Sequence, residues 1–352
     1  MPINPKNEVL LSYIEIPQLN TDLAHVIFLH NGDNEYEFDE TLELYLNNLL
    51  KIYIRNTDYT FLLHDAIECY NLNLNKKLLS FIYWAKKVGI YNRLIISNSY
   101  STFKTNMPFE YYPWFLGKSS YHNVSIDNKN IDKRFLFLNR VPKLHRAKLY
   151  DFLESNNLLE DCYWTFGCNE EYNVLKYYTD KIYPNKSFSD NLSLYEMHTP
   201  IKEYDRSFVS IVTESFFHTT QLAGDSYITW GDDSNLPIPT FITEKTDKCF
   251  TALHPFIMVS TPYFLKHLKE LGFKTFDKWW DESYDEIEDD IIRLGTIYNI
   301  ILEISKWDMY KCKQVLLEME DVLLWNQKLN TDYHFEKRER IHIRNKLNPA
   351  LI

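Results

Sequence analysis

The sequence predicts an α/β protein of two domains with helices at its C-terminal end. The chain has 352 residues, which is more than a single hydrophobic core usually holds. Apolar runs of strand length alternate with segments of helical spacing, as in mainly parallel sheets. From Asp285 onward, apolar residues recur at helical spacing. We expect a first domain with its linker at 1–131, a second at 132–284 and a helical segment at 285–352.

The first domain is expected to begin with a buried strand that ends in a turn at 31–34. The expected strands are 23–30, 51–54, 60–63 and 93–97, and the expected helices are 39–50 and 75–87. Residues 100–131 lose this periodicity and form an inter-domain segment in this interpretation. Its aromatic residues Tyr111, Tyr112 and Trp114 either pack in the interior or offer an acceptor platform.

The second domain shows the same alternation. The expected strands are 134–138, 161–166, 207–212 and 256–260, and the expected helices are 144–156 and one that opens at 244. Ligands of open α/β sheets bind at the carboxyl ends of the strands. The loops that follow these strands are therefore the places to look for a site.

Composition excludes several classes of protein. The net charge is −11, which counts against sequence-independent DNA binding unless a local basic patch exists. Only 8 glycines are present, and neither G-x-G-x-x-G nor a Walker A pattern occurs. The five cysteines form no C-x-x-C pair, which favours reduced thiols in a cytoplasm and makes a zinc site improbable. No apolar run is long enough for a membrane span.

The stretch Pro239–Lys248 carries the first candidate site. Thr243 is a plausible N-cap, which places Glu244 and Lys245 in the first turn of a helix, where backbone N–H groups attract anions. Lys245 adds a positive charge for a phosphate, Glu244 can accept the hydroxyls of a ribose, and Phe241 offers a ring to the base or ribose. Acidic residues are also common in first turns because they complement the helix dipole.

A second basic cluster opens the helix expected at 144–156. Arg140 and Arg146 are able to grip phosphate oxygens in forked geometry, and the alternative is a solvated basic helix start. Positive charge opposes the dipole at a helix N-terminus, which favours an anionic ligand. Glu214 ends a strand and either faces the donor or forms an ordinary polar end with Ser215.

The segment Phe241-Ile-Thr-Glu-Lys245, followed by a helix and Pro255-Phe-Ile-Met-Val259, resembles the donor-binding signature of the fucosyltransferase family. It is also similar to a group of phage and viral glycosyltransferases. The resemblance covers roughly residues 132–285 and includes Phe135–Arg146 and Phe264–Phe276 in the same order. The family has a Phe-Glu-Asn-Ser stretch whose nearest equivalent here is Val212–Ser215, and a long insertion separates it from Phe241. The donor sugar is therefore not assigned.

This resemblance implies a glycosyltransferase with two Rossmann-like domains facing a cleft (GT-B-like) and a nucleotide-diphosphate sugar as co-substrate. It implies that Glu244 contacts the donor ribose and that Lys245 contacts the diphosphate. It also implies that the transfer inverts the configuration at the anomeric carbon of the sugar. We expect Arg140, Arg146, Lys245 and the helix dipole to stabilise the leaving group, so no metal or other cofactor is required. The base that deprotonates the acceptor is expected to be Asp33 or Asp65, although either residue can instead cap the next helix.

The acceptor is either a glycan or, by the phage-like kinship, a hydroxymethylated pyrimidine in DNA, and we favour DNA in a host cytoplasm. A DNA acceptor requires a local basic surface, for which Lys133 and Arg134 are candidates together with Lys104, Lys118, Lys337, Arg338, Arg340, Arg344 and Lys346. The alternatives are a glycan-directed fucosyltransferase-like enzyme and a non-catalytic module that binds nucleotide or glycan. A metal-using nucleotide hydrolase would rely on Asp232 and Asp233, which otherwise form a surface turn.

Overall fold

The computed structural model describes part of the chain. The chain divides into two compact units. The described residues are 25–30, 40–49, 51, 55, 60–65, 76–99, 101, 109–111, 113, 115–117, 119, 125–167, 175, 179–187, 201–218 and 240–332. Unit 1 comprises Met1–Trp114, Tyr227–Pro239 and Arg338–Ile352, and unit 2 comprises Phe115–Ser226 and Thr240–Lys337.

Unit 1 contains a parallel sheet of four strands in the order in which they occur in the chain. The strands are β1 (His25–His30), β2 (Thr60–Asp65), β3 (Leu94–Asn98) and β4 (Phe109–Tyr111). Helix α2 (Glu40–Leu49) lies between β1 and β2 in the chain, and α4 (Lys76–Lys87) lies between β2 and β3. Both crossovers run in the same direction across the sheet, so the right-handed rule places α2 and α4 on the same face.

Contacts between the two helices of unit 1 agree with this placement. Trp84 of α4 donates from Nε1 to Oδ1 of Asn47 in α2 at 3.0 Å. Lys87 pairs with Glu43 at 2.5 Å. The apolar side chains Leu46, Phe81, Trp84 and Ala85 are buried on the facing sides of the helices. The helix α4 is therefore amphipathic, with one side buried, as the sequence predicts.

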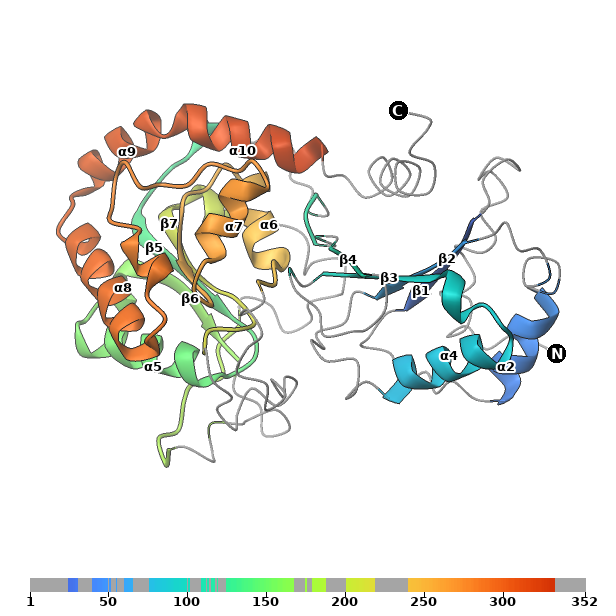
Figure 1. The fold of residues 1–352 in the computed structure, drawn as a ribbon. Helices are drawn as coiled ribbons and strands as arrows, with labels where there is room; N and C mark the ends of the chain where they lie inside the picture. The colour runs from blue at the N-terminus through green and yellow to red at the C-terminus, as the bar shows by residue number, and fades with distance from the viewer. Residues whose placement is uncertain are drawn as a thin grey trace. The chain divides into compact units, whose positions relative to one another are not determined.

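Unit 2 contains a second parallel sheet whose strand order is not the order of the chain (Figure 1). The strands are β5 (Lys133–Asn139), β6 (Cys162–Phe166), β7 (Ser207–Thr213) and β8 (Phe256–Val259), arranged β6-β5-β7-β8. Helix α5 (Leu144–Ser155) connects β5 to β6, and α6 (Glu244–Thr251) lies between β7 and β8. These crossovers run in opposite directions, so right-handedness places α5 and α6 on opposite faces of the sheet.

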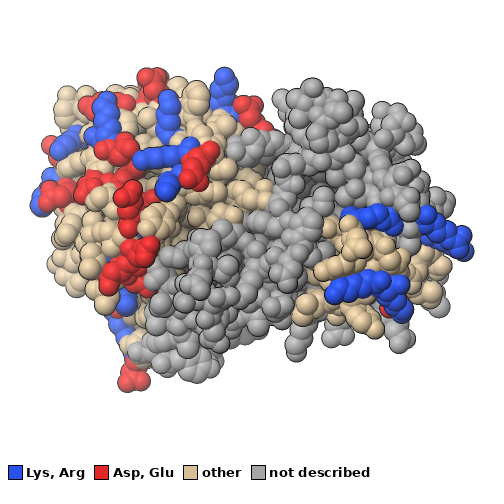
Figure 2. All heavy atoms as spheres, in the orientation of Figure 1, with Lys and Arg blue, Asp and Glu red and all other residues tan. Residues whose placement is uncertain are grey.

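Four further helices complete unit 2 (Figure 1): α7 (Phe264–Glu270), α8 (Asp290–Ser305), α9 (Met309–Glu318) and α10 (Glu320–Asp332). Helix α8 packs beside α5, where the rings of Tyr298 and Phe152 stack with centroids 4.0 Å apart. Helix α10 packs against α6 through Asn330, whose Nδ2 donates to Asp247 at 2.7 Å. On the face of unit 2 that Figure 2 presents, acidic and basic side chains are interspersed.

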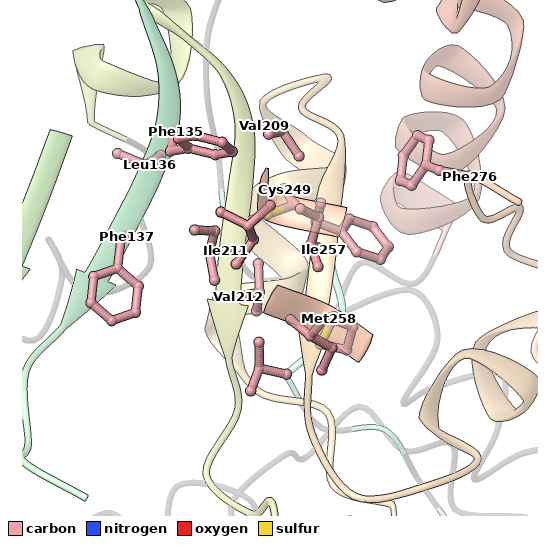
Figure 3. Close-up of a cluster of buried hydrophobic side chains, with 14 of the residues drawn as sticks. Phe135, Leu136, Phe137, Val209, Ile211, Val212, Cys249, Ile257, Met258 and Phe276 are labelled. Atoms are coloured by element: carbon pink, nitrogen blue, oxygen red, sulfur yellow. The ribbon is translucent and has the colours of Figure 1, made fainter. Parts of the chain in front are cut away.

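The core of unit 2 forms around its two central strands. Strand β7 is buried along its whole length, and β5 is buried at Phe135, Leu136 and Phe137. Figure 3 shows these side chains with those of β8, Cys249 of α6 and Phe276. Parallel strands covered by helices on both faces read as continuous apolar runs, which is why the runs at 135–138 and 208–212 predict strands well.

The structure confirms an α/β fold with parallel sheets, and most expected elements lie within two residues of their predicted bounds. The strand expected at 51–54 is wrong at Lys51, which is helical, because a short apolar run does not distinguish strand from helix. The aperiodic segment contains β4, a three-residue strand that follows Pro108 and is too short to show a period. Among the described helices, none has the length and apolar character needed to cross a membrane.

The buried carboxyl group of Glu282 gives unit 2 a pH-dependent stability. Burial raises its pKa to about 7, although Phe276 N donates to it at 2.7 Å and Lys269 lies 3.7 Å away. The folded state therefore keeps a proton that the unfolded chain loses, so stability falls as the pH rises from about 4.5 to 7.

We predict that Glu282→Gln stabilises the protein above pH 7 by on the order of 1–3 kcal/mol, since one pKa unit corresponds to about 1.4 kcal/mol. The amide keeps an acceptor for Phe276 N without the buried charge. Urea denaturation at pH 4 and pH 8 measures the difference, which should vanish at pH 4. Asp277→Asn is the matched control, because Asp277 pairs with the same lysine at 2.9 Å but is exposed. Equal stability of Glu282→Gln and wild type at pH 8 would refute the prediction.

Candidate functional site

The strand order of unit 2 creates a switch point at the carboxyl ends of β5 and β7. The chain leaves β5 toward β6 on one side and leaves β7 toward β8 on the other. Such a point is where open α/β sheets bind ligands, because the two departing loops leave a crevice between them. The sheet of unit 1 follows chain order and has no reversal among its described strands. The site is therefore sought at the carboxyl edge of the unit 2 sheet.

The two strand ends are tied together by side chains. Thr213, the last residue of β7, donates from Oγ1 to Oδ1 of Asn139, the last residue of β5, at 2.6 Å. Gly167, after β6, packs directly on the backbone of Arg140: a Cβ at this position would lie 1.8 Å from the Arg140 carbonyl oxygen. Only glycine fits there. The start of the loop after β5 is therefore held by Gly167 on one side and by the Thr213–Asn139 hydrogen bond on the other.

Glu214 joins the end of β7 to the start of α6. Its buried carboxylate accepts hydrogen bonds from Thr243 N at 3.2 Å, from Thr243 Oγ1 at 2.5 Å and from Thr246 Oγ1 at 2.5 Å. Thr243 is the N-cap of α6, as predicted, and accepts from Lys245 N at 3.3 Å. Glu214 thus fixes the position of the α6 N-terminus, which is a different contribution from the contact with the donor that the sequence suggests.

Glu244 and Lys245 occupy the first turn of α6, with side chains that are 26% and 22% exposed. Burial opposes ionisation of Glu244, but the charges of Lys245 and Lys248 and its own backbone N–H outweigh burial and lower its pKa to about 2. Lys245 Nζ lies 3.0 Å from Thr243 Oγ1, 3.3 Å from Glu244 and 3.8 Å from Glu214. Glu244 is therefore ionised at neutral pH, and both side chains reach the surface, where a ligand can contact them.

Phe241 does not present its ring at the surface. It is buried between Phe115 and Phe216, with ring centroids 5.6 and 5.7 Å away. Lys143 Nζ lies 5.2 Å from the centre of the Phe216 ring. The aromatic residue of the Phe-Ile-Thr-Glu-Lys segment therefore supports the approach to α6 from inside, and a base or ribose stacked on it would first have to displace its neighbours.

The basic residues at the start of α5 bind backbone carbonyls of the segment that leaves β7. We call residues 213–217 the β7 exit. Arg146 is 3% exposed and donates to the carbonyls of Thr213 and Glu214, each at 3.2 Å, and to that of Val141 at 2.7 Å. His145 Nε2 lies 3.2 Å from the Glu214 carbonyl. Lys143 Nζ donates to the Ser215 carbonyl at 2.7 Å.

Two more side chains bind carbonyls of the β7 exit, and the sequence analysis predicted neither. Ser260, after β8, donates to the Phe216 carbonyl at 3.3 Å, and Arg293 of α8 donates to the Phe217 carbonyl at 2.5 Å. All five carbonyls of the β7 exit therefore accept a hydrogen bond from a side chain. Arg293 is a buried arginine among apolar helix positions, and that unusual position was the one available signal.

The start of α5 differs from that of α6. Its N-cap position is Lys143, which makes no side-chain capping hydrogen bond. Helix starts without a side-chain cap leave backbone N–H groups for water or a ligand. Arg140 lies three residues earlier and is exposed, unlike Arg146. The first turn of α5 and Arg140 thus offer donors on one side of the switch point, and Lys245 offers a cation on the other.

Burial lowers the pKa of His145 well below its ordinary value, and the neighbouring charges of Arg146 and Lys143 lower it further. His145 is therefore neutral at physiological pH. Its environment shows that positive charge accumulates on this side of the β7 exit, at the carboxyl edge of the sheet.

Several predicted site residues lie beyond what the structure describes. Asp33, Tyr112 and Trp114 are outside the described residues, as are Asp232 and Asp233. Asp65 is the last residue of β2, where only the backbone is described, and Tyr111 is the half-buried last residue of β4. In the described residues, no group of three or more His, Cys, Asp or Glu side chains is arranged to hold a metal ion.

Comparisons with known proteins add no further constraint on this site. No protein-family model, curated protein or solved structure matches the chain. The interpretation of the site therefore rests on its residues and their geometry.

The two arginines of the basic cluster differ in their surroundings, because Arg146 is buried against backbone carbonyls and Arg140 is exposed. Stability measurements can test this difference. We predict that Arg146→Ala lowers the free energy of unfolding by about 2–4 kcal/mol, because buried carbonyls lose their donors. Arg140→Ala should change it by less than about 0.5 kcal/mol, as is usual for an exposed side chain. Urea denaturation followed by circular dichroism gives both values. If Arg146→Ala keeps full stability but loses affinity for nucleoside diphosphates, Arg146 binds the ligand instead.

Proposed function

We propose that the carboxyl edge of the unit 2 sheet binds the diphosphate of a nucleotide sugar, and that the protein is a glycosyltransferase. The observation that carries this proposal is the pair of helix starts, α5 and α6, on either side of the switch point between β5 and β7. One start has no side-chain cap, and the other carries the partly exposed Glu244 and Lys245. Helix N-termini with a nearby cation are suited to phosphate groups.

Each residue takes a role that follows from its exposure. Lys245 and Arg140 reach the surface and neutralise the diphosphate. Glu244 accepts the hydroxyls of the ribose, as a carboxylate with free lone pairs can do. Glu214, Thr243, Arg146 and Phe241 are buried and hold the two helix starts and the β7 exit in place. In this proposal they act as positioning residues.

The chemistry is proposed as an inverting displacement without a metal. The developing charge on the leaving diphosphate is stabilised by Lys245, Arg140 and the backbone donors of α5. We further propose that the two units are Rossmann-like domains in a GT-B-like enzyme, with the acceptor bound from the side of unit 1. Asp33 and Asp65 remain predictions for the base of unit 1, as do Tyr111, Tyr112 and Trp114 for the acceptor.

The resemblance of Phe241–Lys245 and Pro255–Val259 to the fucosyltransferase signature supports this proposal, as does the similar motif order in phage and viral glycosyltransferases. A non-catalytic module that binds a nucleotide sugar would have the same helix starts. The positioning residues Glu214, Thr243 and Arg146 are compatible with both an enzyme and a non-catalytic module. Release of nucleoside diphosphate from a bound nucleotide sugar separates the enzyme from the module.

We predict that Lys245→Ala and Glu244→Ala weaken nucleoside diphosphate binding by 1.5–3 kcal/mol, about 10- to 150-fold, which is the usual worth of a hydrogen bond to a charged group. Calorimetric titration with UDP and GDP measures the affinity. Lys306→Ala and Glu303→Ala are matched controls, because these two residues form an exposed lysine–glutamate pair at 2.5 Å. Glu303 lies on α8, and Lys306 directly follows the end of that helix. The site would be wrong if both α6 variants bind as the wild type does while remaining folded.

The proposed DNA acceptor makes a separate prediction about salt. Of the basic residues suggested for DNA, Lys133 donates to the Glu160 carbonyl and Arg134 binds Asp161 and the Trp307 carbonyl, so both already have protein partners. If the remaining candidates bind duplex phosphates, log K should fall with log salt by about 0.9 for each phosphate contact. A glycan acceptor should show almost no slope. Titration of a hydroxymethylated duplex and an oligosaccharide across a salt series distinguishes them.

A further inference from the structure

A histidine and an aspartate at the carboxyl edge of unit 2 form a pair to which the proposed site assigns no role. His218 directly follows the β7 exit, and its Nδ1 lies 2.8 Å from Oδ2 of Asp290, the first residue of α8. Burial raises the pKa of Asp290, but hydrogen bonds from His218 and Arg293 outweigh burial and leave it lowered. Asp290 is therefore an anion that accepts from His218 Nδ1–H.

The other ring nitrogen of His218 is buried and has no hydrogen-bond partner among the described residues. The His218 side chain is 3% exposed. A buried polar atom without a partner is destabilising. In native proteins such atoms need an explanation, and a bound ligand or a role in catalysis is one. The pair thus shows an imidazole oriented by a carboxylate, with its second nitrogen bonded to no group among the described residues.

The surroundings of His218 are rigid and close to the surface. Its ring packs edge-on against Phe217 at 5.2 Å and lies 6.1 Å from His145. Arg293 Nη2 binds Oδ1 of Asp290 at 2.7 Å and the Phe217 carbonyl at 2.5 Å.

The next two residues of α8, Ile291 and Ile292, are 78% and 60% exposed, and the Asp290 side chain is 19% exposed. The Asp290 side of the pair therefore reaches the surface, next to two exposed apolar side chains.

The loop does not depend on the His218 ring to hold its shape. Arg293 already binds the Phe217 carbonyl, and Lys143, His145 and Arg146 already bind the preceding carbonyls. A buried apolar side chain at position 218 would fill the same space without the cost of an unpartnered nitrogen. The histidine is therefore better explained by proton transfer than by packing.

We propose that His218, in place of Asp33 or Asp65, is the proton acceptor in the sugar transfer and that Asp290 positions it. This proposal rests on the proposed function. The acceptor hydroxyl gives its proton to His218 Nε2, and its oxygen forms a bond to the anomeric carbon of the sugar. The bond from that carbon to the diphosphate breaks, and the nucleoside diphosphate leaves with the electron pair. Asp290 stabilises the imidazolium, as a carboxylate does when it orients a catalytic histidine. His218 then returns the proton to water.

The first test compares His218→Asn with the wild type. Asparagine retains a donor for Asp290 in the place of Nδ1 but lacks a basic nitrogen. Calorimetry with UDP-glucose, UDP-N-acetylglucosamine, GDP-fucose and GDP-mannose identifies the donor. Release of nucleoside diphosphate from that donor is then measured with a hydroxymethylated duplex, an oligosaccharide or water as acceptor. We expect His218→Asn to bind the donor within about twofold of the wild type and to lose 10²–10⁴-fold in kcat.

The positioning role of Asp290 requires a separate readout. Asp290→Asn should lower kcat without changing KM for the donor, and Asp290→Glu should restore part of the loss. A purely structural aspartate would not give this split. His267→Asn is the matched control, because His267 also faces a carboxylate, that of Glu270, at 3.5 Å on α7. This control should leave kcat unchanged.

A measurement that needs no turnover completes the test. In protein labelled with ¹⁵N-histidine, the His218 Nε2 resonance is identified by its loss in His218→Asn. It should move when the donor saturates the site, while the His267 resonances stay unchanged. The proposal is overturned if His218→Asn turns over as the wild type does, or if the resonance does not respond to bound donor. If the wild type binds none of the nucleotide sugars, the proposed function itself fails.

Discussion

The five carbonyls of the β7 exit are the constraint on which the rest of unit 2 depends. Strand β7 is buried throughout, so the segment that leaves it carries carbonyl groups that water does not satisfy. Side chains from three other regions supply the missing donors: the start of α5, Ser260 after β8, and Arg293 of α8. Residues separated by more than a hundred positions in the chain thus fix one short segment, and that segment fixes Glu214. Glu214 accepts hydrogen bonds from both the backbone N–H and the hydroxyl group of Thr243, the N-cap of α6. The position of α6 therefore follows from the position of the β7 exit.

This constraint explains why positive side chains gather where a helix dipole disfavours them. The sequence interpretation treats the basic start of α5 as a sign of an anionic ligand, since a lysine, a histidine and an arginine oppose the positive end of the helix. In the structure, carbonyl oxygens with partial negative charge compensate these side chains. A buried charge needs such hydrogen bonds wherever it lies. For Arg146, the groups that compensate the charge are carbonyls of the protein and not the anionic ligand that the sequence interpretation expects. Arg140 is exposed and Lys245 is partly exposed, so a ligand can contact both.

Local patterns in the sequence were sufficient for most of the fold. Continuous apolar runs predict β5, β7 and β8, and helical spacing predicts α4, α5 and α8, because each pattern records burial of a regular element. Thr243 was identified as an N-cap because its hydroxyl serves the first turn within the same segment. The strand order β6-β5-β7-β8 was beyond such reasoning, since it depends on which strands pair at long range. The roles of Phe241, Arg146 and Asp247 were also beyond it. Each is decided by partners far away in the chain, such as Phe115, Thr213 and Asn330.

The charge distribution restricts what kind of anion the carboxyl edge of unit 2 can attract. The whole chain carries a net charge of −11, so at long range it repels anions. Around His145, however, burial lowers the pKa of the imidazole, and the charges of Arg146 and Lys143 lower it further, which indicates a local positive potential. At physiological ionic strength such a potential extends about 8 Å into solvent. A compact dianion such as a diphosphate fits within that distance, whereas a nucleic acid extends far beyond it and would need further cations along its length. The electrostatics of unit 2 thus favour a compact anion at this edge and leave the binding of any extended polyanion to other parts of the chain.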